Sequence, residues 1–206
     1  QMGIKTHIFA PDANCSPAGE MATATTTAAY DDYPALDQFA TSIDVVTSEF
    51  ENVPSETMAY LEKLRPVSPG TMALHIAQHR IREKNFAKQH GILTPDFWHI
   101  NDATSLRQAM AELQGRGVLK TCQLGYDGRG QIWIDPSDDL DASFAALGSN
   151  DAILEAAVDF VAEASFLVAR TADNRIAHFP ASQNTHKNGI LNRSVAPAAI
   201  DKNLVA

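Results

Sequence analysis

The stretch LKTCQLGYDGRGQIWI, residues 119–134, places three glycines close together between two apolar runs. Gly125, Gly128 and Gly130 permit positive φ values and let backbone N–H groups approach a ligand. Successive N–H groups in such a turn form a concavity that suits phosphate, and Lys120 before the turn and Arg129 within it offer positive charge. The spacing matches neither the dinucleotide fingerprint nor a Walker A loop. From spacing alone, a plain β-hairpin with YDGRG as its turn therefore stays open as the alternative.

The residues around this stretch indicate a mixed α+β unit. Pro95 forces Thr94 out of helical conformation, so the unit is expected to begin with an extended segment. The predicted elements are a helix over 105–114, strands over 117–121 and 131–134, a helix over 140–147, a strand over 151–158 that bends at its end, and a hairpin over 163–180 with its turn at 172–174.

In the first part of the chain, predicted strands and helices alternate, which favours a parallel sheet covered by helices. The predicted elements are a strand over 5–10, a polar loop to 27, a helix over 33–41, a buried strand over 43–50, and a helix over 55–65 with Ser55 as its N-cap. A single long helix is expected over 71–90, stopped by Gly91. We therefore predict a partial α/β domain over 1–69, a connector helix within 70–94, and a second domain over 95–206.

Composition excludes several classes of protein. The 206 residues carry a net charge of −9, so a broad basic face for nucleic acid is not expected. Neither an apolar run near the roughly 18 residues of a membrane span nor a secretory leader is evident. Cys15 and Cys122 form no metal motif or disulfide framework, which is typical of free thiols in a reducing cytoplasm. The sequence opens on what is expected to be the tail of a helix and stops with no closing element, so we expect an internal piece of a longer protein.

Five stretches in order resemble the ATP-grasp enzymes, and within them the 5-(carboxyamino)imidazole ribonucleotide synthases of purine biosynthesis. They are TSEFENVP (47–54), RIREKNFAKQHGILTP (80–95), the strand ending in lysine with GYDGRGQ (125–131), ILEAAVDFVAEAS (153–165) and NTHKNGIL (184–191). The resemblance covers nearly the whole chain. It implies a partial parallel-sheet domain of the kind that precedes ATP-grasp domains, followed by the ATP-grasp small lobe and the start of the large lobe.

The resemblance also implies ATP-binding residues, with the glycine stretch closing over the ATP phosphates. Lys120 and Arg80 match contacts to the nucleotide phosphates and base, and residues 125–131 match the phosphate-covering loop. The implied ATP-binding residues are Arg80, Lys120, Gly125, Tyr126, Asp127, Gly128, Arg129, Gly130, Gln131, Glu155, Ala156, Ala157, Val158, Glu163 and His186.

The remaining implied roles concern the base, the ribose and the substrate. Residues 155–158 match a hinge that offers backbone groups to the adenine edge, so the Glu155 side chain is expected to matter least. Glu163 matches the acid that holds the ribose hydroxyls, and His186 matches a histidine facing the phosphates. The substrate-side candidates are Glu49, Asn52, Asn184 and Lys187. No catalytic residue is assigned, and the family's magnesium ligands and substrate-phosphate turn would lie outside this chain.

Several of these positions have a structural alternative. Arg80 can be a solvated helix cation, Glu163 an ion-pair partner at a hairpin edge, and His186 a structural histidine. Glu49 and Glu51 stand at i, i+2 of an expected strand and so share a face, as a general acid–base pair would. In the family this segment frames the substrate pocket, and we therefore expect no catalytic role for them.

The implied reaction joins ATP, bicarbonate and aminoimidazole ribonucleotide. Carboxyphosphate forms first, the substrate amine attacks it, and magnesium assists phosphoryl transfer. The family resemblance further suggests a cytoplasmic homodimer. Two other function classes stay open: another ATP-grasp ligase of purine synthesis, and a non-catalytic nucleotide-binding module.

Overall fold

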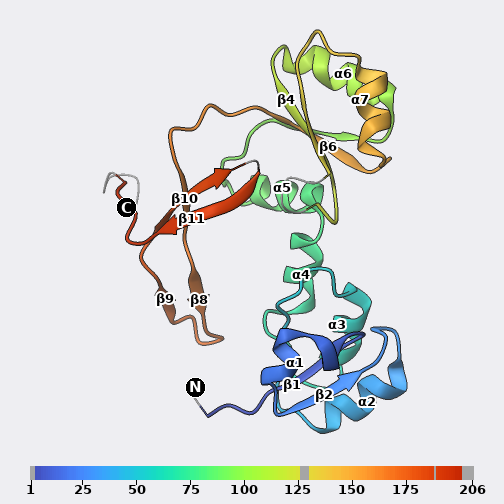
Figure 1. Ribbon diagram of the computed structural model, residues 1–206, viewed down its shortest axis with the longest axis vertical. Helices are drawn as coiled ribbons and strands as arrows, with labels where there is room; N and C mark the ends of the chain where they lie inside the picture. Colours follow the sequence, from blue (N-terminus) through green and yellow to red (C-terminus); the bar gives the residue numbers. More distant parts are fainter. Residues whose placement is uncertain (1–2, 126–129, 188, 201–206) are drawn as a thin grey trace. The chain divides into compact units, whose positions relative to one another are not determined.

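The computed structural model describes residues 3–125, 130–187 and 189–200. The chain divides into two compact units, Gln1–Leu93 and Thr94–Ala206, and each is described by itself. Figure 1 shows the elements of both units along the chain. No helix in the described part of the chain is long and apolar enough to cross a bilayer.

The first unit contains a short parallel sheet and a set of helices. Strand β1 pairs with β2 in parallel, with His7 opposite Ala24 and Ala10 opposite Thr27. The elements are β1 (His7–Ala10), the 3-10 helix η1 (Ala13–Cys15), α1 (Pro17–Met21), β2 (Ala24–Thr27), α2 (Tyr33–Thr41), α3 (Ser55–Glu62), α4 (Thr71–Ala77) and α5 (Arg80–Gln89).

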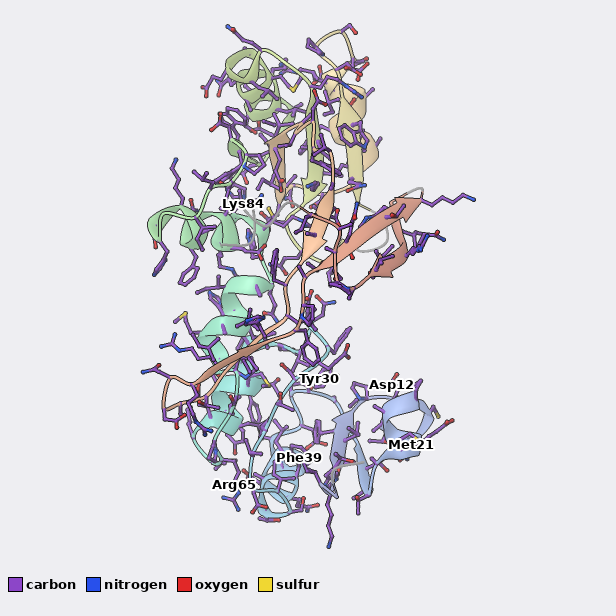
Figure 2. All side chains as sticks on the ribbon, turned by 90° about the vertical axis from the view of Figure 1, so that its left-hand side faces the viewer. Asp12, Met21, Tyr30, Phe39, Arg65 and Lys84 are labelled. Atoms are coloured by element: carbon purple, nitrogen blue, oxygen red, sulfur yellow. The ribbon has the colours of Figure 1, made fainter. Side chains whose placement is uncertain are left out.

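The core of this unit lies between α2, α3 and the segment that joins them. Phe39, labelled in Figure 2, lies in this cluster and packs on Phe9 of β1 with ring centroids 5.3 Å apart. The buried members of the cluster are Leu36, Phe39, Ala40, Val46, Val53, Met58, Leu61 and Leu74. The apolar positions of α2 face inward at helical spacing, which is why the predicted bounds of this helix are confirmed.

Two predictions about strands in this unit are wrong. The polar stretch before residue 27 contains β2, because its three threonines are β-branched and pair with β1. The predicted strand over 43–50 reduces to a single parallel bridge between Val46 and Val67. The Val46 N–H donates to the Pro66 carbonyl at 2.9 Å and the Ser68 N–H donates to the Val46 carbonyl at 2.9 Å. Pairing at one residue is too short to count as a strand.

The predicted helix over 71–90 is two helices. It breaks at His79, whose backbone is extended with φ −138° and ψ 114°. The preceding side chain holds the break, because the Gln78 amide donates to the carbonyls of Glu51 and Val53 at 2.6 and 2.5 Å. Helix α3 also differs from expectation: Pro54 is its N-cap, Ser55 is its first residue, and it ends at Glu62 rather than near 65.

The second unit contains a four-stranded antiparallel sheet in the order β3-β6-β4-β5. Its strands are β3 (Phe97–Ile100), β4 (Gly117–Thr121), β5 (Gln131–Ile134) and β6 (Ala152–Ala156). Helices α6 (Ala103–Leu113) and α7 (Leu140–Leu147) contact each other and pack on this sheet (Figure 1). The bounds predicted for β4, β5 and α7 are confirmed, whereas α6 begins two residues earlier, at a capping box formed by Asp102 and Ser105.

The rest of the second unit is a three-stranded sheet, in the order β11-β10-β7, and a separate hairpin. The strands are β7 (Glu163–Ser165), β8 (Val168–Arg170), β9 (Ile176–His178), β10 (Ser182–Lys187) and β11 (Ile190–Val195). The predicted hairpin over 163–180 is only partly right. Strands β8 and β9 pair around a turn in which Asn174 has φ 65°, but β7 pairs with β10 instead.

Candidate nucleotide-binding site

The four-stranded sheet of the second unit has one core face and one face that borders a cavity. Side chains alternate across a strand, so Leu119 is fully buried toward α6 and α7 while its neighbours Val118 and Lys120 line the cavity. The same alternation puts Trp133 on the cavity side. The cavity has a volume of about 620 Å³ and is lined by Pro95, Val118, Lys120, Gln131, Trp133, Glu155, Ala156, Ala157, Val158, Phe160, Glu163, Asn184, His186 and Gly189.

Lys120 and Glu155 form a buried ion pair on this face. Lys120 Nζ lies 3.1 Å from Glu155 Oε2, and their side chains are 22% and 9% exposed. A buried carboxylate is costly unless it is paired, and Lys120 supplies a cationic partner. The structure therefore adds a role that sequence reasoning missed: the Glu155 side chain holds the lysine that the resemblance assigns to phosphate.

The end of β6 and the segment that follows it line the cavity. The N–H groups of Ala156 and Ala157 donate to the carbonyls of Asp96 and Arg116 at 2.9 and 3.0 Å, which anchors the segment to the sheet. Val158 also lines the cavity, and no hydrogen bond among the described residues uses its N–H. This N–H is therefore a candidate donor to the edge of a planar ligand.

A polar cluster formed by Glu163, Asn184 and His186 lies on β7 and β10. Glu163 stands opposite Asn184 in the antiparallel register. The Asn184 amide donates to Glu163 Oε1 at 3.2 Å, and His186 Nδ1 lies 3.4 Å from the same oxygen. The register of β10 with β11 shifts between Thr185 and His186. The cluster brings together a carboxylate, an amide and an imidazole, which is a set of groups able to bind hydroxyls and phosphate oxygens.

The glycine stretch is described only at its ends. Gly130 has φ 66°, and a Cβ built on it would lie 2.8 Å from Thr121 Oγ1. The Thr121 N–H donates to the Gly130 carbonyl at 2.9 Å, which closes the β4–β5 connection. Tyr126, Asp127, Gly128 and Arg129, four of the implied ATP-binding residues, lie outside the described residues.

Some predicted site residues do not line this cavity. Arg80 is the first residue of α5 in the first unit, and Lys187 is exposed at the end of β10. Glu49 lines a separate cavity within the first unit. Asn52 is exposed in the turn before α3 and lines neither cavity.

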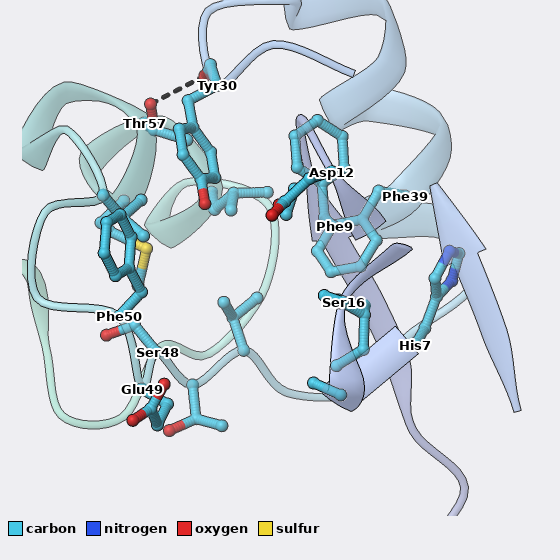
Figure 3. Close-up of a pocket in the computed structure, with 18 residues that line it drawn as sticks. His7, Phe9, Asp12, Ser16, Tyr30, Phe39, Ser48, Glu49, Phe50 and Thr57 are labelled. Atoms are coloured by element: carbon cyan, nitrogen blue, oxygen red, sulfur yellow. Dashed lines mark hydrogen bonds between the residues drawn. The ribbon is translucent and has the colours of Figure 1, made fainter. Parts of the chain in front are cut away.

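The cavity of the first unit has a volume of about 330 Å³ and lies between β1, α2, α3 and residues 46–53. Figure 3 shows the Tyr30 hydroxyl and the Asp12 carboxylate turned toward each other, with Glu49 on the opposite wall. Burial, together with the charge of Asp12, raises the pKa of Tyr30, so the phenol keeps its proton at neutral pH. The Tyr30 carbonyl accepts from Thr57 Oγ1 at 2.7 Å, which fixes this wall of the cavity.

Sequence reasoning missed Asp12, Tyr30, Val118, Trp133 and Phe160. Position within the alternating pattern of residues 117–121 and 131–134 was a usable signal for Val118 and Trp133. Asp12 and Tyr30 stand in connections with no periodic pattern, and only the folded chain brings them together.

Two family models match the chain. The model of the ATP-grasp domain matches residues 85–206, and that of the ribonucleotide synthetase preATP-grasp domain matches residues 1–78. The N5-carboxyaminoimidazole ribonucleotide synthase of Brucella melitensis is 42% identical over 202 residues, which are 97% of this chain and 56% of that protein.

Two solved structures are also similar. The N5-carboxyaminoimidazole synthetase from Staphylococcus aureus complexed with ADP has a TM-score of 0.92 at 32% identity, covering 99% of this chain and 54% of that one. An ADP complex of N5-carboxyaminoimidazole ribonucleotide synthetase has a TM-score of 0.90 at 34% identity, covering 98% and 54%. The chain thus spans about half the length of the relatives it matches. With the domain model matching more than half of its residues, the chain belongs to the ATP-grasp family.

Proposed function

We propose that the protein carrying this chain uses ATP to join bicarbonate to aminoimidazole ribonucleotide, giving N5-carboxyaminoimidazole ribonucleotide through carboxyphosphate. The observation that carries the proposal is the cavity of the second unit. It gathers a cation, a backbone donor with no partner among the described residues, and a carboxylate–imidazole cluster, in a chain that is 42% identical to an N5-carboxyaminoimidazole ribonucleotide synthase. An anionic nucleotide needs these three kinds of partner.

The residues that line the cavity favour one direction for the proposed nucleotide. Lys120 stands at the end of the sheet face where the glycine stretch begins, so we assign it to the phosphates. Val158 stands on the segment after Glu155, where its N–H can donate to the adenine edge. Glu163 can accept hydrogen bonds from the ribose hydroxyls, and His186 beside it can contact the phosphates.

Magnesium is part of the proposal as a companion of ATP, where it would neutralise phosphate charge during transfer. Within the described cavity, the carboxylates that could ligate it are Glu155 and Glu163. Glu155 is paired with Lys120, and Glu163 with Asn184 and His186. Magnesium is usually bound in octahedral geometry by one or two carboxylates together with substrate phosphates. The family resemblance places these carboxylates outside this chain, so no step is assigned to Glu155 or Glu163 through the metal.

The cavity of the first unit is the proposed site for part of the aminoimidazole ribonucleotide. Its carboxylates Asp12 and Glu49 and its neutral Tyr30 can bind amine and hydroxyl groups. Bicarbonate as second substrate, a homodimeric assembly and a cytoplasmic location belong to the same proposal and rest on the family alone. Neither nucleic acid nor membrane is a proposed partner.

The test is ATP turnover by the protein that carries this chain, followed as ADP release with aminoimidazole ribonucleotide and bicarbonate supplied singly and together. We expect full turnover only when both are present. Turnover with another acceptor in place of aminoimidazole ribonucleotide would favour a different ATP-grasp ligase of purine synthesis. Nucleotide binding without turnover under any condition would favour a non-catalytic module.

A further inference from the structure

We infer that Trp133 forms the wall of the nucleotide cavity at its base end and contacts the adenine ring, with Arg116 holding the indole in place. The inference rests on the proposed nucleotide binding and goes beyond it, because neither residue belongs to the set that the family resemblance implies. Trp133 would contact the base, whereas the side chains already assigned in this cavity are proposed to bind the phosphates and the ribose.

Strand register places Trp133 at the base end. Trp133 stands opposite Val118, and Val118 stands opposite Glu155, where the hinge segment begins. Lys120 and Gln131 form the next pair on the same face, toward the glycine stretch. The cavity face of the sheet therefore runs from a phosphate end, at Lys120, to a base end, at Val118 and Trp133.

The Trp133 indole is contacted by a neighbouring cation but stays accessible to solvent. The Arg116 guanidinium carbon lies over the ring, 5.3 Å from its centroid, and Arg116 Nε is paired with Asp135 at 2.8 Å. Trp133 nevertheless remains 53% exposed while lining the cavity. An indole fixed by a cation and left accessible in a cavity offers an aromatic surface to a planar ring.

Arg116 also connects this wall to the hinge. Its backbone carbonyl accepts the Ala157 N–H at 3.0 Å, one residue before Val158. The backbone donor proposed for the adenine edge and the indole proposed for its face are thus both close to Arg116, the residue directly before β4. A base that reaches Val158 would therefore lie within reach of Trp133.

Trp98 provides a contrast within the same sheet. It stands opposite Leu154, a fully buried core residue, and packs against the core cluster on the other face. Its indole Nε1 donates to Glu112 at 2.7 Å. The two tryptophans of the chain therefore lie on opposite faces of one sheet, and Trp98 is a matched control for Trp133.

The first experiment uses fluorescence. The Trp98→Phe variant leaves Trp133 as the only tryptophan, and the Trp133→Phe variant leaves Trp98. On titration with ADP, we expect the emission of Trp133 to change to a plateau, with a fitted Kd equal to the Kd from calorimetry. The emission of Trp98 should stay nearly constant. Arg116→Gln in the Trp98→Phe background should shift the emission before any nucleotide is added, because it removes the cation over the ring.

The second experiment uses affinity. Trp133→Leu should weaken ADP binding roughly tenfold, the scale of one lost aromatic contact, and should leave inorganic tripolyphosphate binding unchanged because that probe has no base. Lys120→Ala should weaken both ligands. Thermal melting checks that Trp133→Leu folds, which we expect from the exposure of the side chain.

The possible results distinguish failure of the nucleotide site from failure of the role of Trp133 alone. Absence of ADP binding by the unmodified chain in calorimetry would overturn the nucleotide site and Trp133 with it. Normal ADP binding by Trp133→Leu, together with constant Trp133 emission during titration, would overturn the role of Trp133 alone. Equal weakening of ADP and tripolyphosphate by Trp133→Leu would also overturn it, since the residue would then act on the whole cavity rather than on the base.

Discussion

The Lys120–Glu155 ion pair links the stability of the fold to the proposed phosphate binding. The two groups come from neighbouring antiparallel strands, and Glu155 is the more deeply buried of them. A pair of this kind is strongly destabilised when one partner is removed, by about 3–5 kcal/mol, because the other charge stays buried. A simple alanine substitution of the lysine therefore mixes two effects.

A double variant separates them. Lys120→Met keeps the apolar stem but removes the charge, so we expect both lower stability and at least about tenfold weaker ADP binding, the equivalent of one charged hydrogen bond. Lys120→Met combined with Glu155→Gln removes both charges and should recover most of the stability while binding stays weak. Urea unfolding and calorimetry on the same samples measure the two quantities. Recovery of wild-type affinity in the double variant would remove Lys120 from the phosphate site.

Glu163 allows a similar test for the ribose. Glu163→Gln preserves size and can still accept a hydrogen bond from the Asn184 amide, so we expect the fold to survive. ADP affinity should fall roughly fivefold to tenfold, because a neutral amide oxygen accepts hydroxyl hydrogen bonds more weakly than a carboxylate. Ser194→Ala is the control, since its hydroxyl donates to Asn184 Oδ1 in the same cluster without touching Glu163. Unfolding of Glu163→Gln with normal affinity of the folded fraction would make Glu163 a structural partner instead.

At the scale of elements, the start of α6 depends on a charged cap. Asp102 accepts the Ser105 N–H at 2.7 Å, and Ser105 Oγ accepts the Asp102 N–H at 3.1 Å. The Ser105 N–H, followed by its hydroxyl, lowers the pKa of Asp102. A carboxylate with a lowered pKa stabilises the fold above its ordinary pKa, and this contribution is lost as pH falls through the folded value.

The Asp102→Asn variant tests the direction of this pH dependence of stability, because asparagine caps helices about as well as aspartate but does not titrate. Near neutral pH, wild type should be the more stable, through the interaction of its charge with the helix N-terminus. The difference in the free energy of unfolding should shrink as pH falls below about 4. Urea titrations at constant ionic strength between neutral and acid pH measure it. A difference that stays constant over this range would contradict the role of the charge.

The β4–β5 connection depends on a glycine in a positive-φ conformation. Gly130→Ala should destabilise the unit by about 1–3 kcal/mol, because it adds backbone strain and a close contact with Thr121. Gly148→Ala is the matched control: Gly148 has φ 70° but no described atom within 4 Å of the added Cβ. The same substitution at Gly130 should cost less in a Thr121→Ala background. Equal costs at the two glycines would show that the contact contributes nothing.

At the scale of the whole molecule, each unit has a hydrophobic core of its own. Leu36 belongs to the cluster of the first unit and Leu106 to that of the second, and both are fully buried. We expect Leu36→Ala and Leu106→Ala each to cost about 2–5 kcal/mol in the unit concerned. Amide hydrogen exchange measured by peptide should rise in α2 and α3 for the first variant and in α6 and β4 for the second. A rise spread equally over both units would contradict separate cores.

Local pattern explains which elements were predictable. In helix α2, Leu36, Phe39 and Ala40 face inward at helical spacing. The sequences of β4 and β5 are short runs of residues that favour strands, bounded by glycine or turn residues. Where a long-range contact decides the backbone, the prediction was wrong. The helix over 71–90 breaks where Gln78 reaches the carbonyls of Glu51 and Val53, more than 20 residues away. Residues 43–50 carry the composition of a strand but find a partner at Val46 only.

The candidate site divides in the same way. The five motifs that resemble the ATP-grasp family implied a phosphate-covering glycine stretch and most of the residues that line the cavity, because each motif is a short run of chain; the spacing of the glycines alone left a plain hairpin open. Only the tertiary structure decided that Glu155 neutralises Lys120, that Glu163 meets His186, and that Trp133 stands over Val118 beside the hinge. The first two contacts join strands that are far apart in the sequence, whereas Trp133 and Val118 belong to the consecutive strands β5 and β4. The register of the distant strands is set by packing of the whole sheet, and no local pattern encodes it.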